Sequence, residues 1–326
     1  MTIATSGASN RLRYRFGSVR LDADVPLSGF EHCRLGAAVE AGTDPFTFTL
    51  RRSSSRPADG RLVLRGRGRR LLEVRRRPDG GHVVTSDEVA ACTLEPDGHT
   101  LLWHLGQDQP GPDDVDFVVA TVLPRALTRQ RAHVLHAATV VGPRGAVLLC
   151  GLSGIGKSTT AAALHRATGW PLLGDDAAVL GLAGGQAVVR SCTQDIRLWD
   201  DARDWLGLPP GVPLPRHGTK ARHPLPGRAR QPAPVAAVVR LAAAGEPVVD
   251  QPVPSRRLVV LRDHLMRLDR ADPAAFAREF SFLVAWMRSV RMVELCRPRR
   301  HAFLPRTVER LVTVATEVAP CAGPTT

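Results

Sequence analysis

Residues 151–158 read Gly-Leu-Ser-Gly-Ile-Gly-Lys-Ser and match the pattern G-x-x-x-x-G-K-[ST]. The three glycines allow successive backbone N–H groups to turn toward the oxygens of a phosphate. A helix that starts near Lys157 would add the positive end of its dipole, and the lysine would reach the β- and γ-phosphates. The Ser158 hydroxyl would be placed for Mg²⁺. This spacing therefore predicts a binding site for a triphosphate or a diphosphate.

The sequence on either side of this loop fits the same role. Residues 146–150 form an apolar run that predicts a strand, and the pattern of residues 159–167 predicts a helix. Strand, glycine-rich loop and helix follow one another in the order that a phosphate-binding loop requires. The residues expected to contact the nucleotide in the loop are Gly151, Ser153, Gly154, Ile155, Gly156, Lys157, Ser158 and Thr159.

The chain contains only two lysines, Lys157 and Lys220, among its 44 basic residues. Since arginine is used wherever a general positive charge is needed, each lysine indicates a position that favours a compact ammonium group on a flexible stem. Lys220 lies in residues 209–234, a basic, proline-rich stretch that predicts a long structureless loop. Such loops are lids, binding loops or linkers. We favour a lid, which makes Lys220 a candidate phosphate contact.

Two adjacent carboxylates, Asp175 and Asp176, follow the apolar residues Leu172 and Leu173. A P-loop protein needs an acidic residue at the end of a strand to hold Mg²⁺ from the side opposite the loop serine. One carboxylate could bind the metal and the other could act as a general base. Neighbouring side chains of an extended strand point to opposite faces, so the pair would separate unless the backbone turns there. An Asp-Asp turn with no catalytic role is the alternative.

These elements together resemble the kinase domain of the HPr kinase/phosphorylase family. The matching residues are the phosphate loop, Leu135-His136-Ala137 before it and Leu173-Gly174-Asp175-Asp176 after it. The similarity is greater to the HPr-kinase-like proteins encoded beside peptide-modification genes, which include lasso-peptide kinases. The loop is also similar to that of phosphoenolpyruvate carboxykinase. The resemblance covers residues 130–240 and implies an α/β kinase domain that uses Mg-ATP. The glycine-rich signature that follows in the bifunctional enzymes is not found, so neither dephosphorylation nor HPr as the substrate is implied.

The resemblance also gives a role to each matching residue. A histidine in an apolar strand is most often a core residue, so His136 owes its role to the resemblance alone. A carboxylate, a metal and a lysine suffice for phosphoryl transfer, which depends on positioning and charge neutralisation. The implied roles are Lys157 as the phosphate lysine, Ser158 and Asp176 as Mg²⁺ ligands, Asp175 as the base that takes the hydroxyl proton, His136 as its neighbour, and Arg197 and Lys220 as basic residues near the phosphates.

Composition limits the classes of function. The formal net charge is +13, and residues 1–130 hold 18 arginines against 16 acidic residues, so most of the excess lies in the part that carries the phosphate loop. This charge favours an acidic partner, a phosphate ligand or nucleic acid, although no recognition helix or stacking motif supports nucleic acid.

Six scattered cysteines without C-x-x-C spacing indicate neither a disulfide framework nor a zinc site. With no signal peptide and no apolar run near the ~18 residues that cross a bilayer, we expect a cytoplasmic protein without a membrane partner.

Residues 1–112 are expected to form a smaller β-rich domain, whose role the sequence does not indicate. Short alternating runs such as 46–50 are separated there by turn-forming residues. The arginines between 65 and 77 predict a solvated strand face rather than a nucleic-acid surface, because aromatic partners for bases are missing. Residues 113–326 are expected to form the P-loop domain, with its core at 130–240.

Hydrophobic periodicity places the further elements of this second domain. Pro124 is expected to kink its first helix. Phe276 and Phe280 are expected to lie in the core. The expected elements are helices at 115–131, 273–290 and 305–318 and a strand at 235–241.

The sequence thus predicts an α/β P-loop kinase of the HPr kinase/phosphoenolpyruvate carboxykinase type, with ATP and Mg²⁺ as cofactors. The expected acceptor is a hydroxyl, most often serine, on a peptide or small protein of acidic character, and the resemblance implies a homo-oligomer. Two alternatives stay open. One is a nucleotide-binding regulatory or scaffold protein, and the other, which we rank lower, is a nucleic-acid-dependent ATPase. The sequence does not separate ATP from pyrophosphate as the donor.

Overall fold

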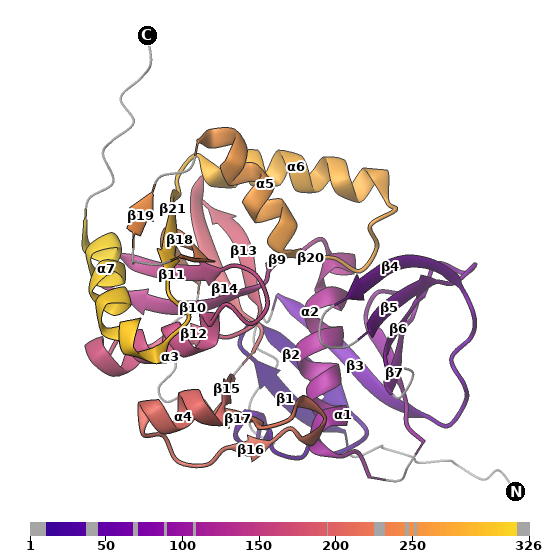
Figure 1. The fold of residues 1–326 in the computed structure, drawn as a ribbon. Helices are drawn as coiled ribbons and strands as arrows, with labels where there is room; N and C mark the ends of the chain where they lie inside the picture. The colour runs from indigo at the N-terminus through magenta and orange to yellow at the C-terminus, as the bar shows by residue number, and fades with distance from the viewer. Residues whose placement is uncertain are drawn as a thin grey trace, which may run out of the picture. The chain divides into compact units, whose positions relative to one another are not determined.

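The computed structural model describes residues 11–36, 45–67, 71–87, 90–106, 109–193, 195–224, 232–244, 248–250 and 253–317 (Figure 1). The chain divides into two compact units, residues 1–122 and 123–326. Residue 112, where we expected the first domain to end, is the first residue of a helical segment that runs across this division. No helix in the described ranges is long and apolar enough to cross a membrane.

The first unit contains an eight-stranded sheet in the order β1-β2-β3-β8-β7-β6-β5-β4. Its side chains alternate between buried and partly exposed, as in β3, where Phe48 and Leu50 are buried and Thr47 and Thr49 are not. This period of two is typical of an antiparallel-rich sheet with one face on a core. The predicted β-rich N-terminal region is therefore confirmed. Its strands are β1 (Leu12–Phe16), β2 (Val19–Ala23), β3 (Phe46–Ser53), β4 (Arg61–Arg67), β5 (Leu71–Arg76), β6 (His82–Ser86), β7 (Ala90–Leu94) and β8 (Thr100–His104).

Three arginines on or beside β4 and β5, Arg65, Arg75 and Arg77, lie next to carboxylates. Arg65 Nε donates to Glu73 at 2.8 Å and Arg75 Nη2 donates to the same side chain at 3.2 Å. The hydrogen bond from Arg65 contributes most to holding the pKa of Glu73 below its usual value. Arg77 donates to Glu95 at 2.9 Å. These contacts are those of a solvated strand face; positions 69 and 70 lie outside the described residues.

The helical segment between the units is α1 (Pro112–Asp116), the π-helical η2 (Phe117–Val122), α2 (Leu123–Ala126) and the 3₁₀ turn η3 (Leu127–Gln130). We expected one helix over 115–131 with a kink at Pro124. The segment is helical, but the regular α-helical hydrogen bonding is lost in η2, just before the proline. Pro124 has no N–H to donate and its ring collides with the preceding turn, so an α-helical ladder cannot run through this position.

The second unit contains a ten-stranded sheet whose main path runs β12-β10-β11-β18-β14-β13-β9-β20, with β21 beside β18 and β19 beside β21. Three adjacent strands, β11, β18 and β21, are parallel. The strands are β9 (His133–Leu135), β10 (Ala137–Gly142), β11 (Gly145–Cys150), β12 (Leu172–Gly174), β13 (Ala178–Ala183), β14 (Gln186–Ser191), β18 (Ala233–Ala243), β19 (Val248–Asp250), β20 (Leu265–Met266) and β21 (Arg291–Arg297). The helices are α3 (Lys157–Thr168), α4 (Asp200–Leu206), α5 (Pro254–His264), α6 (Pro273–Met287) and α7 (Leu304–Thr316), with the short turn η5 (His301–Phe303).

The parallel strands are buried on both faces. In β11, Val147 and Leu149 pack into one hydrophobic core, whereas Leu148 and Cys150 pack into another. Successive residues of a strand face opposite sides, so the two cores lie on opposite faces of the sheet. The first core includes residues of α3 and α7, and the second includes residues of α5 and α6 (Figure 1). This packing fixes the end of β11, from which the phosphate loop starts.

Residues 209–234 differ from the expected structureless loop. They contain β16 (Val212–Pro213), η4 (Pro215–His217), β17 (Lys220–Pro224) and the start of β18; residues 225–231 lie outside the described part. β17 pairs with β16 and with β15 (Asp195–Trp199) in a separate three-stranded sheet. The prediction of a structureless stretch was wrong because strand pairing satisfies the backbone here despite the many prolines.

Helix α6 also corrects an expectation. It ends three residues before the predicted end at 290, and Leu283 and Trp286 are its buried apolar residues. Phe276 and Phe280, expected in the core, are 45% and 47% exposed. The ring of Phe276 instead lies under the guanidinium of Arg262, with 4.5 Å between the guanidinium carbon and the ring centroid. A cation over an aromatic face is a stabilising contact that needs no burial.

Candidate active site

The phosphate loop joins the carboxyl end of β11 to the first turn of α3. All six residues of β11 are buried, and the helix begins at Lys157 directly after Gly156. The helix N-terminus carries no side-chain cap. The first N–H groups of a helix have no partner within the helix, and they carry the positive end of its dipole. The end of β11 therefore leads into a helix terminus whose N–H groups and dipole favour an anion.

Two glycines of the loop are required by their surroundings. Gly151 and Gly156 have φ angles of +140° and +95°. A Cβ atom on Gly151 would lie 2.7 Å from the carbonyl oxygen of Leu241, and one on Gly156 would collide with the guanidinium of Arg297. Any other residue would be strained in both conformation and contact.

Lys157 lies across the loop and is 5% exposed. Its Nζ donates to the carbonyl oxygens of Gly151 at 3.1 Å and Leu152 at 3.3 Å. Burial lowers the pKa of the lysine, and the nearby carboxylates of Asp176 and Asp175 oppose this shift. The ammonium group is therefore held inside the loop, close to the acidic pair.

Asp175 connects the acidic pair to the loop. Its carboxylate accepts a hydrogen bond from Ser158 Oγ at 3.0 Å and another from the backbone N–H of Arg197 at 3.0 Å. The residue has 0% exposure, and burial together with the neighbouring charge of Asp176 raises its pKa to about 6. The two halves of the predicted site thus meet at the contact between Ser158 and Asp175.

The backbone turns at Asp176, so the two carboxylates do not point to opposite faces of a strand. Asp176 has a φ of +63°, and the N–H of Ala177 donates to the carbonyl oxygen of Asp175 at 2.8 Å. Its carboxylate forms an ion pair with Arg197, and the Asp176 side chain is 20% exposed. Burial alone would raise the pKa of Asp176, but the positive charges of Arg197 and Lys220 outweigh it and lower the pKa.

His136 lies between β9 and β10 and contacts the same turn. Its Nδ1 is 2.8 Å from the carbonyl oxygen of Asp176, which can only accept, so Nδ1 carries the proton. Burial lowers the pKa of His136 to about 4, with the charge of Lys157 as a further cause. The ring is therefore neutral at pH 7, and its Nε2 is the nitrogen that can accept a proton. Pairing of β9 with β13 brings His136 to the acidic pair.

The three-stranded sheet supplies the two further basic residues. Arg197 lies on β15 and is 6% exposed. Lys220 pairs with Trp199 across β15 and β17, and its Nζ lies 5.9 Å from the centroid of the Trp199 ring. The charge of Lys220 acts on both carboxylates and on Lys157. The structure thus gathers all the expected catalytic and basic side chains around the start of α3.

Thr193 is a member of this site that we did not anticipate from the sequence. Its Oγ1 donates to the carbonyl oxygen of Asp175 at 2.8 Å and accepts from the N–H of Asp175 at 3.1 Å, and it is 3% exposed. A threonine after a strand carries no signal that could have identified it. It fixes the backbone from which the carboxylate of Asp175 extends.

Replacing Thr193 with Val is expected to lower the free energy of unfolding by about 1–3 kcal/mol, because both backbone groups of Asp175 lose a buried partner. Urea denaturation of the full chain measures the change. Thr193→Ser keeps the hydroxyl and serves as the matched control, with a smaller loss. Equal stability of the Val variant and the wild type would show that these two hydrogen bonds contribute nothing net.

The oxygen atoms beside the loop fit a magnesium ion. Ser158 and Asp175 place a hydroxyl and a carboxylate in contact, and hard divalent cations prefer such oxygen ligands. Within the described residues no group of three or more His, Cys, Asp or Glu side chains could hold a metal. Mg²⁺ commonly takes one or two protein ligands and completes its shell with water and substrate phosphates.

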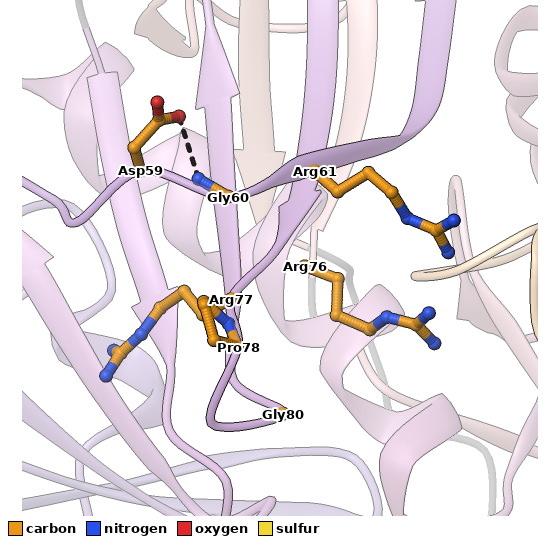
Figure 2. A pocket seen from close by; sticks show the side chains of 7 residues that line it. All are labelled: Asp59, Gly60, Arg61, Arg76, Arg77, Pro78 and Gly80. Atoms are coloured by element: carbon orange, nitrogen blue, oxygen red, sulfur yellow. Dashed lines mark hydrogen bonds between the residues drawn. The ribbon is translucent and has the colours of Figure 1, made fainter.

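A pocket of about 690 Å³ lies in the first unit and contains none of these residues. Figure 2 shows Arg61 and Arg76 extending to the same side of it, and the two lie opposite each other in the pairing of β4 with β5. Every lining residue is exposed or half-buried, and we assign the pocket no ligand. It is lined by Asp59, Gly60, Arg61, Arg76, Arg77, Pro78 and Gly80.

Comparison with known proteins agrees with the P-loop class. Residues 147–301 match the family model described as an AAA domain. This segment includes the phosphate loop, the acidic pair, Arg197 and Lys220. No curated protein matches the chain. The α/β P-loop fold that follows a β-rich N-terminal region is thus confirmed.

One solved structure to which the chain is similar is the Hpr(Ser) kinase/phosphatase from Coxiella burnetii, at 17% sequence identity. The match covers 55% of this chain and 93% of that chain, with a TM-score of 0.28.

Proposed function

We propose that this protein is a kinase of the HPr-kinase-like type, which uses Mg-ATP to phosphorylate a hydroxyl group, that of a serine, on a peptide or small protein. The observation that carries this proposal is the hydrogen bond of 3.0 Å between Ser158 and Asp175. It joins the phosphate loop to the acidic pair, so that the groups that bind phosphate and the groups that can orient a nucleophile border the same space. Phosphoryl transfer needs little more than this positioning and charge neutralisation.

On the nucleotide side, the loop N–H groups and Lys157 bind the phosphates. Ser158 and Asp175 would hold Mg²⁺, which offsets the negative charge of the phosphates when it is bound. This exchanges the roles that the resemblance gave to the two carboxylates. We make the exchange because Ser158 contacts Asp175, whereas Asp176 is paired with Arg197.

On the acceptor side, Asp176 orients the hydroxyl and accepts its proton. Asp175 has no exposed surface, while the Asp176 side chain is 20% exposed and can be reached by a substrate. In a loose transition state the acceptor hydroxyl must be oriented but need not lose its proton early, so a carboxylate of low pKa suffices. His136 supports the turn through its hydrogen bond to the Asp176 carbonyl.

The charge of the chain supports an acidic substrate. Most of the net charge of +13 lies beyond residue 130. A positive field raises the rate of encounter with an acidic peptide. The resemblance supports serine as the acceptor.

Transfer of label from γ-labelled ATP tests this proposal. The full chain is incubated with Mg-ATP and serine peptides of acidic or basic composition. We expect alkali-labile phosphoserine, more of it on acidic peptides, and none when EDTA removes the metal. Labelled pyrophosphate in place of ATP shows which compound is the donor. Bound nucleotide without any label on a peptide would contradict the kinase and leave the regulatory or scaffold role.

The match to an AAA-domain model favours one second candidate, an ATPase that transfers the phosphoryl group to water. It predicts release of inorganic phosphate in the absence of any peptide, at a rate that acidic peptides do not change. A kinase predicts the opposite, with labelled peptide formed faster than free phosphate.

A further inference from the structure

Arg297, at the carboxyl end of β21, packs against the phosphate loop although it lies far from it in the sequence. Its Nη2 donates to the carbonyl oxygen of Ile155 at 3.0 Å, to that of Gly156 at 3.5 Å and to Thr160 Oγ1 at 3.1 Å. The side chain is 3% exposed. Arg299 reaches the same loop, with Nη2 2.9 Å from the carbonyl oxygen of Gly154.

These contacts determine where the loop N–H groups point. A trans peptide is planar, so the carbonyl of one residue and the N–H of the next point in opposite directions. Arg297 holds the carbonyl of Ile155 toward itself, so it directs the N–H group of Gly156 to the other side. The carbonyl of Gly156 accepts from the N–H of Thr160 at 2.9 Å and has Arg297 as a longer second contact. The N–H group of Gly156 lies at the start of α3, where helix termini favour an anion.

The buried positive charge of Arg297 is a second reason to connect this residue with the phosphate site. Its contacts are to carbonyl and hydroxyl oxygens, and no carboxylate in the described part of the chain forms an ion pair with it. Its Nε is buried without a hydrogen-bond partner. Leaving an uncompensated charge in the interior is costly. The phosphates of a bound nucleotide would supply the missing negative charge across the loop.

We propose that Arg297 is a positioning residue for the phosphate loop, which orients the N–H group of Gly156 and adds positive potential for the phosphates of a bound nucleotide. The inference rests on the proposed nucleotide binding. Beyond nucleotide binding itself, it assigns the end of β21, a strand far along the chain, a role in shaping the phosphate site. Arg299 supports the exposed end of the loop in the same way.

Calorimetric titration of the full chain with ADP and with adenosine tests this role. Arg297→Gln keeps an amide donor but removes the charge, and we expect it to weaken ADP binding about 10- to 100-fold, the size of a lost charge-assisted hydrogen bond. Adenosine binding should change less than threefold. Arg297→Lys keeps the charge and should recover part of the ADP affinity. Addition of millimolar ethylguanidinium to Arg297→Ala should recover part of it as well.

Arg291→Ala is the matched control. Arg291 starts the same strand, is half-buried, and donates to the carbonyl of Val314 and to Glu317, away from the loop. Its loss should leave ADP affinity within twofold of wild type. Unchanged ADP affinity in Arg297→Gln, or an equal loss for ADP and adenosine, would overturn the inference while the proposed function stands. Failure of the wild type to bind ADP would overturn both.

Discussion

Replacing Asp176 with Asn is expected to lower the rate of phosphoryl transfer by about 10²–10⁴-fold, the range for loss of a general base, while the affinity for Mg-ATP changes only a few-fold. The carboxylate of Asp176 is partly exposed and paired with Arg197, whereas its carbonyl binds His136. The substitution therefore removes the acceptor of the hydroxyl proton and keeps the backbone contact. Single-turnover label transfer measures the rate, and calorimetric titration with a non-hydrolysable ATP analogue measures the affinity.

Asp175→Asn is the matched variant, and its main effect should be on nucleotide binding. Asp175 contacts Ser158, so its loss should weaken Mg²⁺-dependent nucleotide binding about 10- to 100-fold, as for a hydrogen bond to a charged group. Affinity measured in EDTA should be similar in both variants and the wild type. Weak Mg-ATP binding in the Asp176 variant with normal binding in the Asp175 variant would restore the roles that the family resemblance implied.

Replacing Lys157 with Ala is expected to lower phosphoryl transfer by about 10²–10³-fold, the range found when one group that stabilises transition-state charge is removed. The ammonium group is buried within the loop and is held by two carbonyl oxygens, so no other charge of the loop can take its place. The same transfer assay measures the loss, and circular dichroism checks that the fold is kept.

Lys157→Arg keeps the positive charge at this position but changes the size and shape of the group that carries it. The Nζ of Lys157 is held in a buried site, 3.1 Å and 3.3 Å from two carbonyl oxygens, and a planar guanidinium is larger than this ammonium group. The arginine variant should therefore stay impaired. Lys220→Ala, which removes the other lysine of the chain, should cost less, because Lys220 lies outside the loop and influences the acidic pair through its charge. Full activity of Lys157→Arg would show that any positive charge serves at this position.

Several parts of the site were predictable because they are encoded in short contiguous stretches. The loop at 151–156 depends on glycines at fixed spacing, a buried strand before it and a helix after it, all of which are local properties. The alternation that predicts strands in the first unit is local in the same sense. The spacing of Asp175 and Asp176 likewise identified an acidic pair, although not the direction of either side chain.

Other features depend on contacts between distant segments, and no local pattern reveals them. Phe276 has the apolar character of a core residue, but the packing of α6 places its ring under Arg262 at the surface. The stretch around Lys220 has the prolines of a loop, yet pairing with β15 makes it a strand. In both cases the neighbour that decides the outcome is remote in the sequence.

The amino-acid sequence by itself determined the α/β P-loop class, the phosphate loop and the identity of the acidic pair, since each of these follows from the local conformational preferences of adjacent residues. The tertiary structure alone decided that the backbone turns at Asp176, that Ser158 contacts Asp175, and that Arg297 lies against the loop. The physical reason is that strand order and helix packing bring together groups far apart in the chain. The burial and the hydrogen bonds that set the charge state of these groups therefore depend on contacts that only the folded chain makes.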